Sequence, residues 1–144
     1  MSIAAILDTN VIVQALIGSP RAASSRMLAA YAQKRFRLIF SFATFEELDA
    51  VLKLPAIRAR HGFADEKLRG YMAFLLANSS IHSASESTIA ASITRDITDT
   101  KFLALAQQSN ADFLVTNDRR HLLPVREFGP TKIVTPAHFL RKLP

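Results

Sequence analysis

The sequence contains no cysteine in its 144 residues. This absence excludes disulfides, thiolate zinc sites, iron–sulfur clusters and cysteine nucleophiles, so any metal ion must be held by oxygen or imidazole. No apolar run approaches the roughly 18 residues that a membrane-spanning helix needs, and Asp8 interrupts the N-terminal apolar stretch before it reaches the length of a secretory signal. We therefore expect no membrane segment and a cytoplasmic location.

Glycine and proline are few, with four and six copies scattered along the chain. No linker, repeat or low-complexity stretch interrupts the sequence. The length is near the commonest size for one domain, and 49% hydrophobic with 21% charged residues is the composition of an ordinary globular protein. These features predict a single domain over residues 1–144.

Acidic residues are fewer than basic ones, which leaves a formal net charge of +6. Such a charge suits a polyanionic partner, because neutralising phosphates releases counterions and gives sequence-independent affinity. Many basic domains bind no nucleic acid, however, so the charge alone does not identify the partner.

Short apolar runs alternate with helical patterns along the chain. The runs that predict buried strands are Ile3–Leu7, Arg37–Phe40 and Asp112–Thr116, with weaker candidates at Ser80–Ser83 and Thr131–Val134. Apolar residues at spacings of three and four predict helices over Ala22–Lys34, Ala43–Leu54, Asp65–Ala77 and Thr100–Gln108, and a short closing helix from Pro136 to Leu143. This alternation predicts an α/β fold, a three-layer α/β/α sandwich on a mainly parallel, Rossmann-like sheet.

Two aspartates stand at the carboxyl ends of predicted strands. Asp8 follows Ile3–Leu7 directly, and Asp118 comes two residues after Asp112–Thr116. In open parallel sheets ligands bind beyond these strand ends, so the two carboxylates converge if their strands are neighbours. For either residue alone the simpler interpretation is structural: Asp8 as the cap of a helix beginning near Asn10, and Asp118 as a turn residue.

Three further acids join this set with differing weight. Asp99 precedes a helical pattern, where an acid also serves as an ordinary cap, and Asp96 is either a metal ligand or a solvated loop acid. Glu47 shares a helix face with apolar residues such as Val51, which is unfavourable unless the carboxylate is paired, protonated or bound to a metal. A salt bridge or an outward bend explains Glu47 equally well.

Taken together, the acids predict more than each does alone. Clustered carboxylates repel one another unless a cation joins them, and oxygen ligands suit Mg²⁺ or Mn²⁺. Such an ion favours hydrolysis of a phosphodiester without a protein nucleophile. Arg119 and Arg120, just after Asp118, are weak candidates for substrate phosphate contacts, and a solvated turn explains them equally well.

Four segments resemble the PIN domain, and particularly bacterial PIN-domain toxins of the VapC kind. These segments are Ile6–Val11, Ser41–Leu48, Asp96–Leu103 and Ala111–Asp118, and the resemblance spans essentially the whole chain. The resemblance implies a three-layer α/β/α fold and an Mg²⁺- or Mn²⁺-dependent endoribonuclease. It also implies a homodimer and an antitoxin partner, for which nothing in the composition gives a sign.

Position by position, the resemblance assigns the acidic, catalytic and metal-binding site to Asp8, Glu47, Asp99 and Asp118. It adds Asp96 as a further metal ligand, and Asn10 and Thr116 as polar residues that support the acids or water. Relatives often carry glycine where Asn117 precedes the last acid, and asparagine tolerates the same left-handed turn conformation.

Other functions fit the motifs less well. A haloacid-dehalogenase-type phosphotransferase needs Asp-x-Asp after the first strand, whereas this chain has Asn10 in the third position. A receiver-like domain would need an acidic pair after the first strand and a lysine after a late strand, and neither is present. The remaining alternative is a non-catalytic PIN-like module that binds RNA or a protein, with its acids serving as caps and turns.

Overall fold

The computed structural model describes residues 2–83 and 97–144, with the backbone alone for 97–99. Six strands form one sheet: β1 (Ile3–Leu7), β2 (Phe36–Ser41), β3 (Ser79–His82), β4 (Phe113–Val115), β5 (Glu127–Phe128) and β6 (Thr131–Val134). The helices are α1 (Thr9–Ile17), α2 (Ala23–Ala32), α3 (Phe42–Leu52), α4 (Pro55–His61), α5 (Asp65–Leu76), α7 (Ile97–Ser109) and α8 (Pro136–Lys142), with a 3₁₀ turn at Leu123–Val125.

The strand order is β3-β2-β1-β4-β6-β5, and only the β5–β6 pair is antiparallel. The mainly parallel sheet is therefore as predicted. The chain moves outward from β1 through β2 to β3 and then returns to place β4 on the other side of β1. The carboxyl ends of β1 and β4 thus meet where the strand order reverses, the usual ligand position in open α/β sheets.

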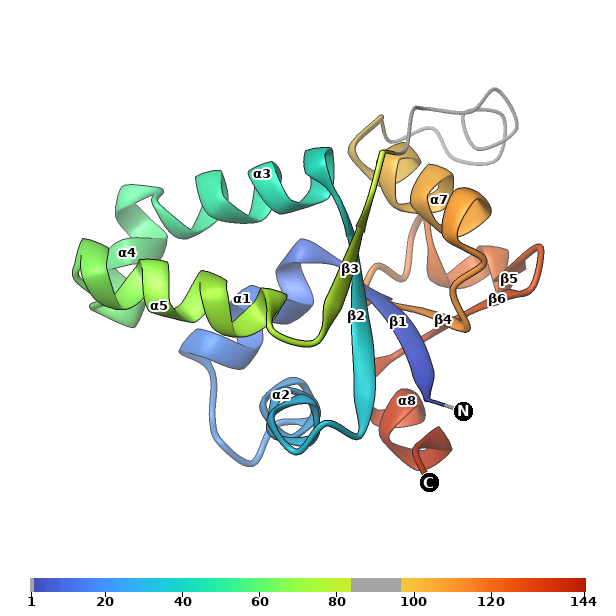
Figure 1. Cartoon of the computed structure of the whole chain (residues 1–144), viewed down its shortest axis with the longest axis horizontal. Helices are drawn as coiled ribbons and strands as arrows, with labels where there is room; N and C mark the ends of the chain where they lie inside the picture. Colours follow the sequence, from blue (N-terminus) through green and yellow to red (C-terminus); the bar gives the residue numbers. More distant parts are fainter. Residues whose placement is uncertain (1, 84–96) are drawn as a thin grey trace.

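Alternating side chains of β1 feed two separate cores. Ala5 and Leu7 pack with residues of α1, α2, α3, α5 and α8 on one face, whereas Ala4 and Ile6 pack mainly with α7 on the other. Figure 1 shows the sheet between these two groups of helices. The three-layer α/β/α architecture is confirmed, because every central strand has both faces covered.

Local sequence signals place the helices around the carboxyl edge of the sheet. A reciprocal capping box starts α3: the Ser41 Oγ accepts from the Thr44 N–H, and the Thr44 Oγ1 accepts from the Ser41 N–H. The short helix α4, which the sequence patterns did not predict, begins with Pro55 at its first turn and ends at Gly62 in the left-handed conformation, with φ of 68°. No helix in the described ranges is long and apolar enough to cross a bilayer.

A buried tyrosine ties α2 to the turn before β3. The Tyr31 hydroxyl donates to the Leu75 carbonyl at 2.6 Å and accepts from the Asn78 N–H at 2.9 Å. Replacing Tyr31→Phe should lower the free energy of unfolding by about 1–3 kcal/mol, because a buried backbone carbonyl and a partly buried N–H lose their partner. Urea unfolding monitored by circular dichroism measures this change.

Tyr71→Phe is the matched control. Tyr71 is half-buried, and within the described part of the chain its hydroxyl makes no hydrogen bond. The control should lose no stability. An equal loss in both variants would show that removal of the hydroxyl from the packing, rather than loss of the hydrogen bonds, sets the cost.

Candidate active site

Three acids line one cavity at the carboxyl edge of the sheet. The cavity has a volume of about 580 Å³ and is lined by Asp8, Thr9, Asn10, Val13, Gln14, Ile17, Glu47, Val51, Ile57, Arg60, Phe102, Asn117 and Asp118. We call it the acidic cavity. Its walls come from α1, α3, α4, α7 and the loop after β4, so segments far apart in the sequence converge beside the reversal point of the sheet.

Asp8 holds the N-cap position of α1 without making a side-chain capping hydrogen bond. Its Oδ2 instead accepts from the Thr116 Oγ1 at 2.8 Å, and its side chain is only 7% exposed. Asp8 therefore occupies the predicted cap position, and its carboxylate also connects α1 to the end of the neighbouring strand through Thr116.

Thr116 connects two of the acids. Its Oγ1 donates to Asp8 and accepts from the backbone N–H of Asp118 at 2.9 Å, and the residue is fully buried. The Asp118 Oδ1 in turn accepts from the backbone N–H groups of Arg120 and His121, each at 3.0 Å. Asp118 thus makes the expected turn interactions and lines the acidic cavity as well.

Glu47 is paired, as one of the sequence interpretations held. Its Oε1 accepts from the Lys101 Nζ at 2.9 Å, and its Oε2 accepts from the Thr9 Oγ1 at 2.5 Å. The side chains of Glu47 and Lys101 are 21% and 24% exposed, so the ion pair is largely shielded from water. The neighbouring Glu46 is exposed and does not line the cavity.

The carboxylates are close enough to affect one another. Burial raises the pKa of the Asp8 carboxyl above its ordinary value of 3.8, and the charges of Glu47 and Asp118 raise it further. The hydrogen bond from Thr116 and the nearby N–H of Asn10 lower this pKa in part. Burial is the largest effect, so Asp8 carries a charge that its surroundings disfavour.

The remaining predicted residues either line the cavity, lie outside it or fall outside the described part of the chain. Asn10 is exposed and lines the acidic cavity, whereas Arg119 and Arg120 are exposed in the turn after Asp118 and are not among its lining residues. Asp99 lies in α7, but its side chain is outside the described residues, and Asp96 is outside them altogether. Within the ranges that are described, no group of three His, Cys, Asp or Glu side chains is positioned to hold a metal ion.

Sequence patterns did not single out Thr9, Arg60 or Lys101. Arg60 reaches the acidic cavity from α4, and the signal that could have found this helix is the proline and glycine at its two ends. Lys101 sits two residues after Asp99 on α7, and nothing in helical periodicity reveals that it meets Glu47.

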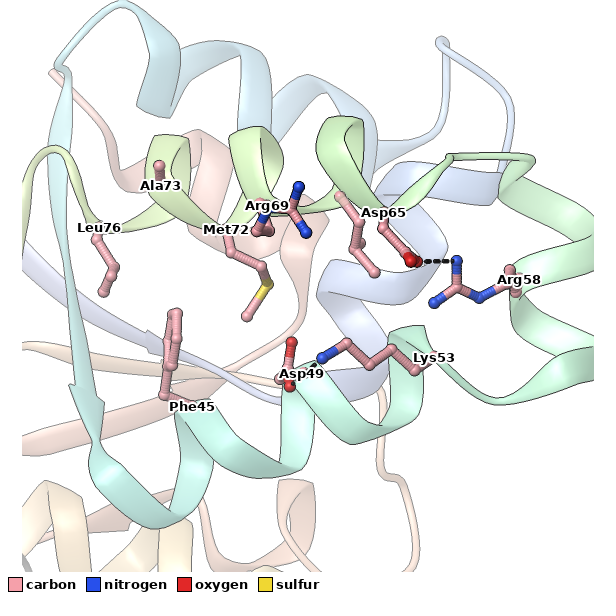
Figure 2. Close-up of a pocket in the computed structure, with 10 residues that line it drawn as sticks. Phe45, Asp49, Lys53, Arg58, Asp65, Arg69, Met72, Ala73 and Leu76 are labelled. Atoms are coloured by element: carbon pink, nitrogen blue, oxygen red, sulfur yellow. Dashed lines mark hydrogen bonds and ion pairs between the residues drawn. The ribbon is translucent and has the colours of Figure 1, made fainter.

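A second cavity of about 620 Å³ lies between α3 and α5. Figure 2 shows its apolar side chains from the two helices, with Phe45, Met72 and Leu76 among them. Four of the charged groups that line it form two ion pairs, Asp49 with Lys53 and Arg58 with Asp65. With its acids paired over an apolar lining, this cavity lacks the convergent acids of the acidic cavity.

Comparisons with known proteins agree with this architecture. A family model described as PIN domain matches residues 4–120. The crystal structure of PAE2754 from Pyrobaculum aerophilum is similar at a TM-score of 0.58 and 16% identity, covering 97% of this chain and 88% of the other. The structure of FitAB bound to the IR36 DNA fragment is similar at a TM-score of 0.58 and 19% identity, covering 92% of this chain and 94% of the other. At these identities the two structures support the fold alone. Comparison with curated proteins gives no significant match.

Asp8→Asn should stabilise the metal-free protein at neutral pH. Because folding raises the pKa of Asp8, the folded protein binds the proton of this carboxyl more tightly than the unfolded chain does. The stabilisation that results is fully present at a pH below the unfolded pKa, and it is lost as the pH rises through the folded pKa. The variant removes this loss, so its advantage in the free energy of unfolding should shrink as pH falls toward 3.8. Urea unfolding in EDTA across this pH range tests the sign.

The control for this experiment is Glu46→Gln, which neutralises an exposed acid outside the acidic cavity. Its stability should follow that of the wild type at every pH. A Asp8→Asn variant that is less stable than the wild type at neutral pH would mean that the hydrogen bonds to Asp8 outweigh its desolvation.

Proposed function

The chain belongs to the PIN domain family, and from that premise we propose that it is an Mg²⁺- or Mn²⁺-dependent endoribonuclease. The observation that carries the proposal is the convergence of Asp8, Glu47 and Asp118 on one cavity at the reversal point of the sheet. Caps and turns scattered over the surface would not share a cavity, nor would two of them raise the pKa of the third.

The donor set has the chemistry that a hard divalent cation prefers. All three acids offer carboxylate oxygens, and among the described residues that line the acidic cavity there is neither sulfur nor imidazole. We propose Asp8, Glu47, Asp99 and Asp118 as the catalytic and metal-binding acids, with Asp96 as a further ligand. The raised pKa of Asp8 supports this proposal, since an ion among the acids would relieve the repulsion that contributes to it.

When bound, such an ion supplies an activated water and stabilises charge on the phosphate. The chain's own residues keep the acids in place. Thr116 orients Asp8 and the backbone of Asp118 together, and Thr9 fixes one oxygen of Glu47. We propose that Asn10, an exposed residue that lines the cavity, orients the acids or water.

Basic side chains near the acids suit a phosphate backbone. Arg60 lines the acidic cavity, and Arg119 and Arg120 follow Asp118 in the chain. With the net charge of +6, these residues favour a nucleic acid, and the family resemblance favours RNA. Because FitAB was solved with a DNA fragment, DNA is a necessary second substrate in any test.

PIN domains are often nucleases of toxin–antitoxin systems, and we propose the same setting here. The chain would then be a cytoplasmic toxin, one PIN domain over residues 1–144, active as a homodimer and neutralised by a cognate antitoxin protein. These points rest on the resemblance of its motifs to VapC-like toxins.

A non-catalytic module that binds RNA or protein is the second candidate. Two observations favour it: Glu47 is already neutralised by Lys101, and no three acids among the described side chains are spaced to hold a metal. Binding of a divalent cation distinguishes the candidates, because a catalytic acidic cluster should be stabilised by Mn²⁺ and a set of caps should not.

Cleavage of a mixed pool of single-stranded and structured RNA tests the proposed activity. Asp8→Asn and Glu47→Gln should each lower the rate by about 100-fold, the loss typical when one group that stabilises the transition state is removed. EDTA should abolish cleavage, and Mg²⁺ or Mn²⁺ should restore it.

Glu46→Gln, one residue from Glu47 on the same helix but outside the cavity, should cut at the wild-type rate. If the wild type cuts neither RNA nor DNA with any metal, or if Asp8→Asn cuts as well as the wild type, the binding module becomes the better account.

Arg60→Ala tests the substrate contact separately from the chemistry. The variant should weaken RNA binding by about fivefold. The negative slope of log affinity against log salt concentration should become shallower by about one, as expected for one lost phosphate contact. Filter binding at several salt concentrations measures both. Arg69→Ala, at the cavity between α3 and α5, is the control and should bind RNA normally. An unchanged salt slope in Arg60→Ala would place the RNA elsewhere.

A further inference from the structure

Lys101, a residue on the opposite side of the sheet from Glu47, adds a positive charge beside the acidic cavity. Lys101 comes from α7, and its Nζ lies 2.9 Å from the Oε1 of Glu47 on α3. The hydrophobic residues of α3 and α7 belong to different cores, on opposite faces of the sheet. Figure 1 shows the two helices on either side of the carboxyl ends of the strands. The Lys101 side chain therefore reaches over the edge of the sheet to make this contact.

The local charges explain why a lysine is useful here. Three acids line the acidic cavity, and Arg60, which is exposed, is the single basic residue among its described lining residues. Burying like charges together is unfavourable unless a cation lies among them. The side chains of Lys101 and Glu47 are 24% and 21% exposed, so water screens the charge of the lysine only in part.

Both oxygens of Glu47 are occupied. Thr9 donates to Oε2 and Lys101 donates to Oε1. A divalent cation that binds Glu47 through Oε1 must therefore share that oxygen with the ammonium group or displace it, and one that binds through Oε2 must compete with the Thr9 hydroxyl while lying beside the same ammonium group. Sharing places two positive charges against one carboxylate, which is repulsive, and displacement costs the ion pair.

We propose that Lys101 is an internal counter-cation that holds Glu47 when the site has no divalent ion and competes with that ion for the carboxylate. The inference rests on the proposed function, in that it concerns the cation the acids are proposed to bind. Lys101 is a positioning residue in this scheme: it keeps the acidic site folded without metal and lowers its affinity for metal.

Calorimetric titration of the full chain with Mn²⁺ tests the competition directly. Lys101→Met keeps most of the side-chain volume and removes the charge, so it should bind Mn²⁺ about tenfold more tightly, within the usual range of coupling between two ligands. In EDTA its melting temperature should fall below that of the wild type, and saturating Mn²⁺ should close the gap.

Two controls separate charge from packing. Lys101→Arg keeps the positive charge and should bind Mn²⁺ no more tightly than the wild type. Lys53→Met removes the lysine that follows α3 and pairs with Asp49, outside the acidic cavity, and should leave Mn²⁺ affinity unchanged.

Each outcome decides between the two proposals. If Lys101→Met binds Mn²⁺ with equal or weaker affinity than the wild type, the counter-cation role is wrong while a metal-dependent nuclease still stands. If the wild type and every variant fail to bind Mn²⁺ or Mg²⁺, the metal dependence of the proposed function fails together with it. If Lys101→Met unfolds in EDTA, Lys101→Arg decides the question. Tighter binding of Mn²⁺ by Lys101→Arg than by the wild type would then overturn the proposed competition between the lysine and the metal ion.

Discussion

The parallel pairing of β1 with β4 is the contact on which the site depends. Leu7 is in register with Val115. The residues that follow these two strands, Asp8 and Thr116, therefore lie side by side at the edge of the sheet. The backbone N–H of Asp8 still donates to the Val115 carbonyl, and the Thr116 hydroxyl completes the connection to the Asp8 carboxylate. A slip of one residue would turn Thr116 to the opposite face and leave Asp8 buried without this donor.

This placement makes the site a destabilising part of the fold. Asp8 is buried close to two other acids, and burial works against its charge. Partners remote in sequence compensate in part: Thr116 at the end of β4 donates to Asp8, and Thr9 of α1 and Lys101 of α7 donate to Glu47. Residues that lower stability and are nevertheless supported by several partners are characteristic of functional sites, where activity rather than stability decides the residue.

Periodicity and strand-end positions were enough to predict the sheet and the meeting of Asp8 with Asp118, because parallel neighbours bring their carboxyl ends to one edge. The spacing of apolar residues on its helix marked Glu47 as a carboxylate that is paired, protonated, bound to a metal or bent outward. The spacing could not identify its partner, since the contact with Lys101 depends on how two helices from opposite faces overhang the edge. Arg60 was missed for a related reason: seven residues of α4 are too few for a helical period to stand out.

The two cavities differ in what their ion pairs join. At the cavity between α3 and α5, Asp49 pairs with Lys53 within one helix and Arg58 with Asp65 between neighbours on the same face, so these pairs reinforce packing that already exists. Glu47 and Lys101 instead join helices whose apolar sides belong to separate cores, and Phe102, the residue after Lys101, belongs to the second core and also lines the acidic cavity. A change of charge at Glu47 therefore acts on both layers of the sandwich at once, whereas a change at Asp49 acts on one.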